Sequence, residues 1–174
     1  MKNKISDKIH LVKDLMAKTV ELPPRAPILY RWWFRDGSEI VKKVCEHLNE
    51  IEVQKIKTEK LGGKTYYALY FGKGINGRRR IKNHIGSRKR ISTLRRTIAA
   101  LLETDNEKDI TEHLQQCYYE WWEYDCDKKT LEGKELSMIN DDDYYYPLNL
   151  KDNNKISEEW KNYLQNKRKQ LVSK

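Results

Sequence analysis

Three side chains suited to phosphodiester hydrolysis follow one another in the middle of the chain. Tyr70 ends a short apolar run, Arg80 follows ten residues later, and His84 lies four residues beyond Arg80. Because residues four apart share one face of a helix, Arg80 and His84 can point into one cleft beside the tyrosine. Hydrolysis of a phosphodiester needs a cation on the phosphoryl oxygens, a group that assists deprotonation of water and, commonly, a carboxylate that holds a divalent metal. The sequence contains candidates for all three.

The charge distribution indicates a polyanionic partner. The chain has 174 residues, with 35 Lys and Arg against 26 Asp and Glu, a formal net charge of +9. Residues 60–102 contain twelve basic residues and no acidic one, whereas residues 103–146 contain fourteen acidic and four basic residues. We expect the basic segment to form a positive surface where phosphates bind. The alternatives are a solvated helix face or, for the acidic segment, a docking site for a basic protein.

Other classes of protein are disfavoured by composition. No segment approaches the roughly 18 uninterrupted apolar residues of a membrane span, and residues 1–20 mix charged and apolar positions unlike a signal peptide. The three cysteines, Cys45, Cys117 and Cys126, are odd in number and lack a CxxC spacing, which argues against a disulfide framework and a structural zinc site. We expect reduced thiols, no membrane partner and a cytoplasmic location.

The spacing of apolar residues predicts a small domain that mixes helices and strands. Helices are expected at residues 5–20, 38–48, 78–85, 94–102, 130–139 and 157–169. Strands are expected at residues 28–34, 51–56, 66–71 and 115–124. The predicted fold class is therefore α+β, a mixed α/β arrangement in which helices flank a small, mainly antiparallel central sheet of three to four strands.

Two tripeptides on the predicted strands resemble the signature of a known family, the GIY-YIG nucleases. Ile28-Leu29-Tyr30 is similar to the first tripeptide, with isoleucine where glycine is usual, and Tyr70-Phe71-Gly72 is similar to the second, with phenylalanine for isoleucine. The step of ten residues to Arg80 and the histidine four positions beyond it also resemble the family pattern. The resemblance extends over about residues 27–150, where Asn149 follows a downstream carboxylate.

Shorter segments narrow the resemblance to the small stand-alone GIY-YIG proteins of bacteria. They are Leu22-Pro23-Pro24, Ser92-Thr93-Leu94-Arg95-Arg96 and Pro147-Leu148-Asn149-Leu150. The implied organisation is an N-terminal helix with a proline-rich lead-in at residues 1–26, a nuclease domain at 27–150 and a C-terminal helix packed on it at 151–174. Because the two tyrosines of the motifs lie forty residues apart, farther than in compact members, we expect an insertion at about 36–63.

The resemblance implies a role for each of these side chains. In this family the arginine, here Arg80, stabilises the charge that builds on the phosphate. One tyrosine helps to activate the attacking water, and Tyr30 and Tyr70 hold the two motif positions. His84 takes the place of a third aromatic residue or histidine. A glutamate binds a single divalent metal, Mg²⁺ or alternatively Mn²⁺, and one carboxylate suffices because Mg²⁺ keeps several of its waters.

Two glutamates are candidates for this metal ligand. Glu135 is followed three and four residues later by apolar positions, as in the family, and lies fourteen residues before Asn149. Glu132 lies one helical turn earlier on nearly the same face, so it is the second choice. The resemblance alone leaves both open, with Glu135 preferred.

Basic and polar residues near these positions are candidates for backbone contacts that give affinity without sequence information. They are Lys73, Arg78, Arg79, Arg88, Lys89, Arg90, Arg95, Arg96 and Asn149. Lys73 follows Tyr70 by three residues, so it would touch a phosphate or orient the tyrosine hydroxyl. Charge for solubility is the alternative for each basic residue. Trp32-Trp33 and Trp121-Trp122 are expected to pack the sheet against its helices rather than to stack on bases.

The activity predicted from these residues is that of a metal-dependent nuclease that cuts by in-line attack of water, with DNA favoured over RNA as the substrate. The alternative is a non-catalytic nucleic-acid-binding module on the same scaffold. Substrate specificity and biological role are not encoded in the motifs. A dimer is expected if the protein cuts both strands of a duplex.

Overall fold

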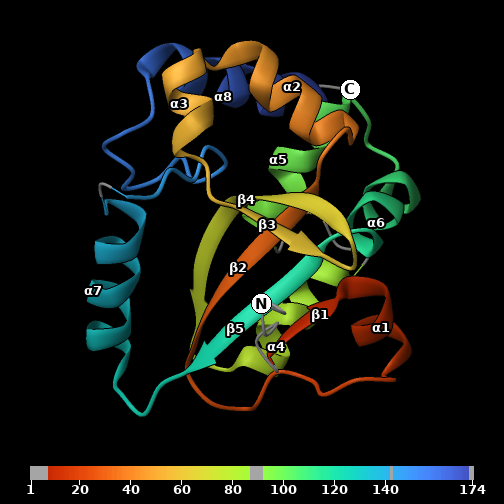
Figure 1. The fold of residues 1–174 in the computed structure, drawn as a ribbon, viewed down its shortest axis with the longest axis vertical. Coiled ribbons are helices and arrows are strands. Elements are labelled where there is room, and N and C mark those ends of the chain that lie inside the picture. The colour runs from red at the N-terminus through yellow and green to blue at the C-terminus, as the bar shows by residue number, and fades with distance from the viewer. Residues whose placement is uncertain (1–7, 87–91, 142, 173–174) are drawn as a thin grey trace.

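The chain folds around one antiparallel sheet, whose long strands cross the middle of Figure 1. The computed structural model describes residues 8–86, 92–141 and 143–172. The five strands within these residues are β1 (Ile9–Leu11), β2 (Ile28–Arg35), β3 (Thr58–Leu61), β4 (Lys64–Gly74) and β5 (Tyr118–Glu123). They lie in the order β1-β5-β2-β4-β3, so β2 is central and two short strands form the edges.

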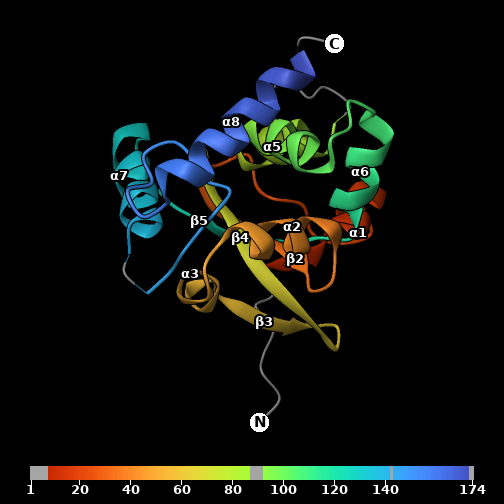
Figure 2. The same cartoon turned by 90° about the horizontal axis from the view of Figure 1, so that it is seen from above.

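Eight helices in the described part of the chain surround the sheet. They are α1 (Val12–Ala17), α2 (Glu39–His47), α3 (Glu50–Lys55), α4 (Gly77–Ile85), α5 (Thr93–Leu102), α6 (Glu107–Gln115), α7 (Lys128–Ile139) and α8 (Glu158–Val172). One face of the sheet packs against α1, α2, α4, α5, α6 and α8, and the other face packs against α7. Figure 2 shows α8 alongside α5, with α7 apart from both. None of these helices combines the length and the apolar character that crossing a bilayer would require.

Strand β2 is apolar on both faces because helices cover both faces. Tyr30 and Trp32 point into the larger core beneath α5 and α8, whereas Leu29 and Trp33 point into the smaller core beneath α7. Both tryptophans of this pair are therefore buried, and Trp121 on β5 is buried as well. The expectation that these rings pack the sheet holds for all three.

Local capping and turn residues determine where the elements begin. Side chains that accept a backbone N–H at helix N-termini are Ser38 for α2, Asn49 for α3, Asn76 for α4, Ser92 for α5, Asn106 for α6 and Asp127 for α7. The β3–β4 hairpin turns on Gly62 and Gly63, which both have positive φ. A two-residue turn between twisted strands requires this backbone conformation, which glycine adopts without steric cost.

The predicted α+β class is confirmed, but the predicted number of strands is too low. Residues 51–56, expected as a strand, belong mainly to α3, because Asn49 and Glu52 form a reciprocal capping box that starts a helix there. The edge strand is β3, which follows directly. The helix expected at 5–20 is also shorter, since residues 9–11 pair with β5 before α1 begins, and residues 5–7 lie outside the described part.

The chain between the two motif strands contains α2, α3 and β3, which lie within the stretch 36–63 that was expected as an insertion. Helix α6 was not expected from the sequence. Its Asn106 cap and its acidic first turn, with Glu107 and Asp109, are the local signals that mark it.

A buried ion pair joins β2 to β5 on the face covered by α7. The Arg31 guanidinium donates two hydrogen bonds to one carboxylate oxygen of Glu120, at 2.8 and 3.0 Å, and Trp33 Nε1 donates to the same oxygen at 2.9 Å. Arg31 also donates to the Tyr146 hydroxyl at 3.3 Å and lies 4.7 and 5.0 Å from the ring centroids of Trp33 and Trp122. Each buried charge therefore depends on the other for compensation.

Glu120→Gln is expected to lower the free energy of unfolding by about 3–5 kcal/mol, because the Arg31 charge then stays buried without its partner. Urea denaturation followed by tryptophan fluorescence measures this change. Glu123→Gln, at the exposed end of the same strand, is the matched control and should change stability by less than about 0.5 kcal/mol. Equal effects of the two substitutions would contradict the importance of the ion pair.

Candidate active site

The register between β2 and β4 places the two tyrosine motifs side by side. Tyr30 pairs with Gly72, and Trp32 pairs with Tyr70, so both tyrosines project from one face of the sheet with ring centroids 6.4 Å apart. A Cβ atom on Gly72 would lie 2.5 Å from the Tyr30 hydroxyl oxygen. The glycine of the second motif thus provides the space that the tyrosine of the first motif occupies.

Helix α4 brings Arg80 to Tyr30. Asn76 caps the helix, and a Cβ atom on Gly74 would lie 2.8 Å from Arg80 Cβ, so the end of β4 passes close to the arginine. Arg80 Nε donates to the Tyr30 hydroxyl at 2.9 Å. Within the described residues this hydroxyl is the only hydrogen-bond partner of the Arg80 side chain, which leaves both Nη groups able to donate to a ligand. The neighbouring Tyr30 hydroxyl raises the pKa of the guanidinium, so Arg80 stays charged.

His84 contacts the same tyrosine one helical turn after Arg80. Its Nε2 lies 2.7 Å from the Tyr30 hydroxyl, and its Nδ1 lies 2.8 Å from the hydroxyl of Ser92, the residue that caps α5. The imidazole has no exposed surface. Burial, with the nearby charges of Arg80 and Arg95, lowers its pKa well below 6.5, so His84 is neutral. It therefore connects the first motif to the start of α5.

Burial keeps both motif tyrosines protonated at neutral pH. Tyr30 is fully buried, and this burial raises its pKa well above 10 although Arg80 acts in the opposite direction. Burial also raises the pKa of Tyr70; Arg80 opposes this shift, whereas the carboxylate of Glu135 adds to it. Both groups are therefore neutral phenols that donate and accept hydrogen bonds.

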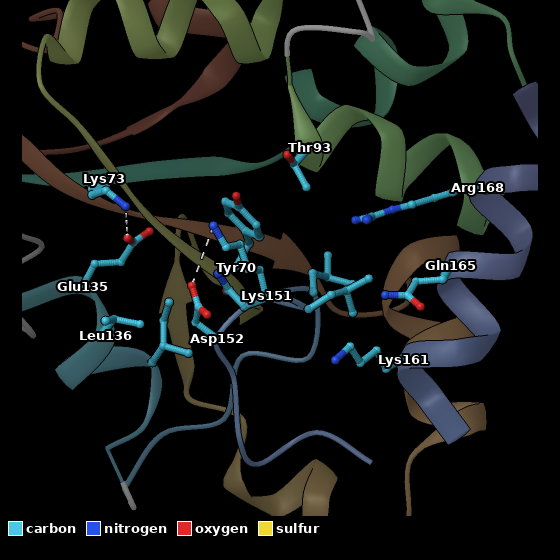
Figure 3. Close-up of a pocket in the computed structure, with 14 residues that line it drawn as sticks. Tyr70, Lys73, Thr93, Glu135, Leu136, Lys151, Asp152, Lys161, Gln165 and Arg168 are labelled. Carbon is cyan, nitrogen blue, oxygen red and sulfur yellow. Dashed lines mark hydrogen bonds and ion pairs between the residues drawn. The ribbon is translucent and has the colours of Figure 1, made fainter. Parts of the chain in front are cut away.

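A cavity of about 510 Å³ adjoins Tyr70, with α7 on one side and α8 on the other (Figure 3). The residues singled out from the sequence that line it are Tyr70, Lys73, Glu135 and Asn149. Of the predicted catalytic residues, Tyr30, Arg80 and His84 do not line it and are linked to the cavity through the Tyr30–Tyr70 contact. Three lining residues on α8, Lys161, Gln165 and Arg168, were not predicted, and their helical spacing of four and three residues is the only sequence signal that they share a face.

Helix α7 brings Glu135 to this cavity, rather than Glu132. The Asp127 side chain accepts a backbone N–H at 2.7 Å and starts the helix two residues before the expected position. Glu135 is largely buried and forms an ion pair with Lys73 of β4. Glu132 lies on a more exposed part of the helix, with its Oε1 4.0 Å from Lys128 Nζ. The geometry therefore favours Glu135 over Glu132.

The chemistry of this site suits a hard divalent cation that keeps most of its waters. No cluster of three or more potential metal-binding side chains occurs in residues 8–86, 92–141 and 143–172. Glu135, however, presents a carboxylate at the wall of a cavity with room for water, and Mg²⁺ commonly uses only one or two carboxylates. Because Lys73 pairs with that carboxylate, a cation would have to share or replace the ammonium.

Asn149 is bonded to β4 through both polar atoms of its amide, and its expected contact with nucleic acid stays a prediction. Its Oδ1 accepts from the backbone N–H of Phe71 at 2.8 Å, and its Nδ2 donates to the Phe71 carbonyl at 2.7 Å. The preceding Leu148 N–H donates to the Leu69 carbonyl at 3.0 Å. Asn149 thus attaches the chain after α7 to the strand that carries Tyr70.

Arg95, another expected phosphate contact, lies in the core instead of on the surface. Arg95 has no exposed surface, because the first turn of α5 directs it into the core beside α6. Its Nη2 donates to the Glu107 carboxylate at 2.6 Å and to Thr111 Oγ1 at 3.0 Å, and its Nη1 donates to the His84 carbonyl at 3.0 Å. The guanidinium thus supports α4 and α6 from a fully buried position.

The other basic residues that were expected to contact phosphates differ in their exposure. Arg79 and Arg96 are exposed, and Arg78 is half-buried, with its Nε donating to the Pro23 carbonyl at 3.2 Å. Arg88, Lys89 and Arg90 lie outside the described residues. Lys64 begins β4 at the end opposite Lys73. The described basic residues of segment 60–102 therefore do not all share one face, although the charge pattern had suggested a single positive surface.

The curled antiparallel sheet, the paired tyrosines and the arginine-bearing helix define a chain of the GIY-YIG fold class. Residues 28–170 match the family described as the GIY-YIG catalytic domain. Because this match covers most of the chain, the protein belongs to the GIY-YIG family, a family of nucleases, and the resemblance seen in the sequence is confirmed. The match begins at the first residue of β2 and extends into α8. Comparisons with curated proteins and with solved structures find no significant match.

The buried, neutral state of His84 should make stability depend on pH. In the unfolded chain a histidine has a pKa near 6.5, whereas the pKa of folded His84 is well below this value. Below about pH 6.5 the unfolded state therefore binds a proton that the native state excludes. The free energy of unfolding should fall as the pH is lowered from 7 to 5, by up to about 1.4 kcal/mol per pH unit from this residue.

Urea denaturation at a series of pH values measures this dependence. In His84→Asn the contribution of this residue to the slope should disappear. His47→Asn, at an exposed position, leaves the imidazole of His84 in place and should retain the contribution of His84 to the pH dependence. A slope that is the same in wild type and His84→Asn would show that the imidazole does not titrate as described.

Proposed function

We propose that the protein is a metal-dependent endonuclease that hydrolyses phosphodiester bonds of DNA. The observation that carries the proposal is the position of Tyr70, which lines one cavity with Glu135 and lies beside Tyr30, the partner of Arg80. The phenol of Tyr70 and the carboxylate of Glu135 thus line one cavity, and the Arg80 guanidinium is linked to that cavity through the contact between Tyr30 and Tyr70. Membership of the GIY-YIG family supports nuclease activity in general. The DNA substrate and the metal are our own proposal.

In the proposed reaction water attacks the phosphorus in line with the leaving oxygen, so that one P–O bond forms as the other breaks. The hydroxyl oxygen of Tyr70 accepts a hydrogen bond from the water and orients it. The free Nη groups of Arg80 donate to the phosphoryl oxygens, where negative charge increases in the transition state. Lys73 lies at the wall of the cavity, where it pairs with Glu135.

Glu135 would hold the divalent cation, Mg²⁺ or Mn²⁺, with Glu132 as the second choice. The bound cation supplies Lewis-acid stabilisation of the leaving oxygen. Lys73 holds the Glu135 carboxylate at the wall that Tyr70 also forms. The carboxylate is thus kept in place before a cation binds.

Tyr30 and His84 act as positioning residues in this proposal. Both are fully buried, so neither touches the substrate directly. The Tyr30 hydroxyl fixes the direction of the Arg80 guanidinium, and His84 fixes the hydroxyl. Because a misplaced catalytic group loses much of its effect, these buried contacts are required for the rate.

We further propose that the protein acts in the cytoplasm. The three cysteines are free thiols, as is usual in a reducing compartment.

The domain boundaries at residues 26 and 150, and a dimer for cleavage of both strands, also remain proposals. The continuity of the family match into α8 favours treating residues 151–170 as part of the catalytic unit.

Arg80→Ala is expected to lower the rate of cleavage by about 10²- to 10³-fold, because the phosphoryl charge loses a positioned donor. Cleavage of supercoiled plasmid and labelled oligonucleotides in Mg²⁺ measures the rate, and gel-shift assays in EDTA measure binding. Arg79→Ala removes the same charge from an exposed position on the same helix and should retain most of the rate. Equal loss in both variants would show that Arg80 contributes only general positive charge.

Glu135→Gln should abolish the metal-dependent cleavage, since an amide is a poor ligand for Mg²⁺ compared with a carboxylate. EDTA should have the same effect on the wild type. Glu132→Gln, one turn away on α7, is the matched control and should remain active. Binding of DNA without cleavage by the wild type in either Mg²⁺ or Mn²⁺ would favour the non-catalytic binding module instead.

A further inference from the structure

The wall of the cavity opposite Glu135 is formed by the C-terminal helix. Lys161, Gln165 and Arg168 lie on one face of α8, and Figure 3 shows all three directed toward the cavity, across from the Lys73–Glu135 pair. The motifs of the catalytic domain include none of these three. This wall, called the α8 wall below and consisting of these three residues, therefore needs its own explanation.

The charge in the cavity is concentrated on the α8 wall. Lys73 is neutralised by Glu135, and Lys151 lies 4.0 Å from Asp152. Lys161 and Arg168, in contrast, form no ion pair with any carboxylate in the part of the chain that the structure describes. The positive potential of the cavity thus increases toward α8.

Arg168 is held in place but only partly satisfied. Its Nη2 donates to the hydroxyl of Thr97 on α5, which fixes the guanidinium against the neighbouring helix. Its Nε is buried and has no hydrogen-bond partner among the described residues. Burial and the nearby charge of Arg96 lower the pKa of Arg168 to about 10, whereas Tyr70 raises it. Arg168 is half-buried, and a buried donor such as its Nε is costly unless a ligand compensates it.

The start of α5 faces the same space. Thr93, the first residue of this ten-residue helix, lines the cavity and is drawn above Arg168 in Figure 3. The N-terminus of a helix carries partial positive charge and attracts anions. It therefore adds to the field of the α8 wall, which already contains two unpaired cations.

We propose that the α8 wall binds a second phosphate of the same nucleic-acid strand, adjacent to the phosphate that is cut. The inference rests on the proposed function for the class of ligand. Arginine suits this role because its planar guanidinium presents several donors to one phosphate. A volume of about 510 Å³ lies in the range of pockets that enclose a small ligand, so it has room for more than a single phosphate. Arg168 and Lys161 would thus position the strand relative to Tyr70.

The test compares Arg168→Gln with Lys169→Gln, which removes the same charge from the neighbouring exposed position outside the cavity. Binding is measured in EDTA to DNA duplexes, and to RNA duplexes of the same sequence, over a range of salt concentrations. A matched series of DNA duplexes carries one uncharged methylphosphonate at successive positions. Loss of one phosphate contact should reduce the slope of log K against log salt by about 0.9 in Arg168→Gln.

The expected result is that one methylphosphonate position weakens binding of wild type and Lys169→Gln but not of Arg168→Gln. Arg168→Lys should restore most of the lost sensitivity. Because Arg168 also bonds to Thr97, thermal unfolding checks that each variant is folded. If Arg168→Gln does not fold, Lys161→Gln tests the same wall. Identical salt slopes and identical methylphosphonate profiles in the α8-wall variants and Lys169→Gln would overturn the proposal.

The failure of the proposed function gives a different pattern. If the wild type never cleaves in Mg²⁺ or Mn²⁺ but the methylphosphonate effect depends on Arg168, the phosphate subsite stands without the nuclease. If the wild type cleaves and Arg168→Gln binds like Lys169→Gln, the nuclease stands without the subsite. If no variant and no wild type binds either duplex, both proposals fail.

Discussion

The hydroxyl of Tyr30 is the point on which the candidate site depends. It is fully buried and is contacted by Arg80 and His84 of α4, while its ring occupies the space that Gly72 leaves on the adjacent strand. A buried hydroxyl needs its partners, since leaving it unpaired would cost free energy. The same contacts that satisfy it therefore fix the angle of α4 against the sheet. The same contacts therefore satisfy the buried hydroxyl and set the direction of the Arg80 guanidinium.

Opposite charges that are separated in the sequence are paired in the fold. The acidic segment 103–146 supplies Glu107 to Arg95, Glu120 to Arg31 and Glu135 to Lys73. Three of the fourteen acidic residues in this segment thus compensate cations that are buried or half-buried. The unpaired cations of the described chain that line the cavity come from α8. Net charge predicted a polyanionic partner, but pairing determines where that partner would meet free positive charge.

Local sequence patterns predicted features that lie within a single helix or strand. Features that depend on the packing of one element against another were not predicted. The Tyr70–Arg80–His84 spacing placed Arg80 and His84 on one helix, and the apolar and aromatic residues of 28–34 predicted the strand β2. Residues 51–56 were misjudged because apolar alternation was weighed above the capping box of Asn49. Arg95 was misjudged because its sequence neighbours are basic, whereas its burial is decided by α6. The α8 wall was missed since no motif links residues near 165 to Tyr70; only the packing of α8 on α5 does so.

The long connections between the parts of the site have a consequence for how the molecule folds. Tyr30 and Tyr70 are forty residues apart, and Glu135 follows sixty-five residues later, so each of these two contacts closes a large loop. Contacts of this kind form slowly, because chain entropy is lost before they contribute stability. A nascent or partly unfolded chain would therefore hold these groups apart. Assembly of the site is accordingly a late event, completed only with the central sheet.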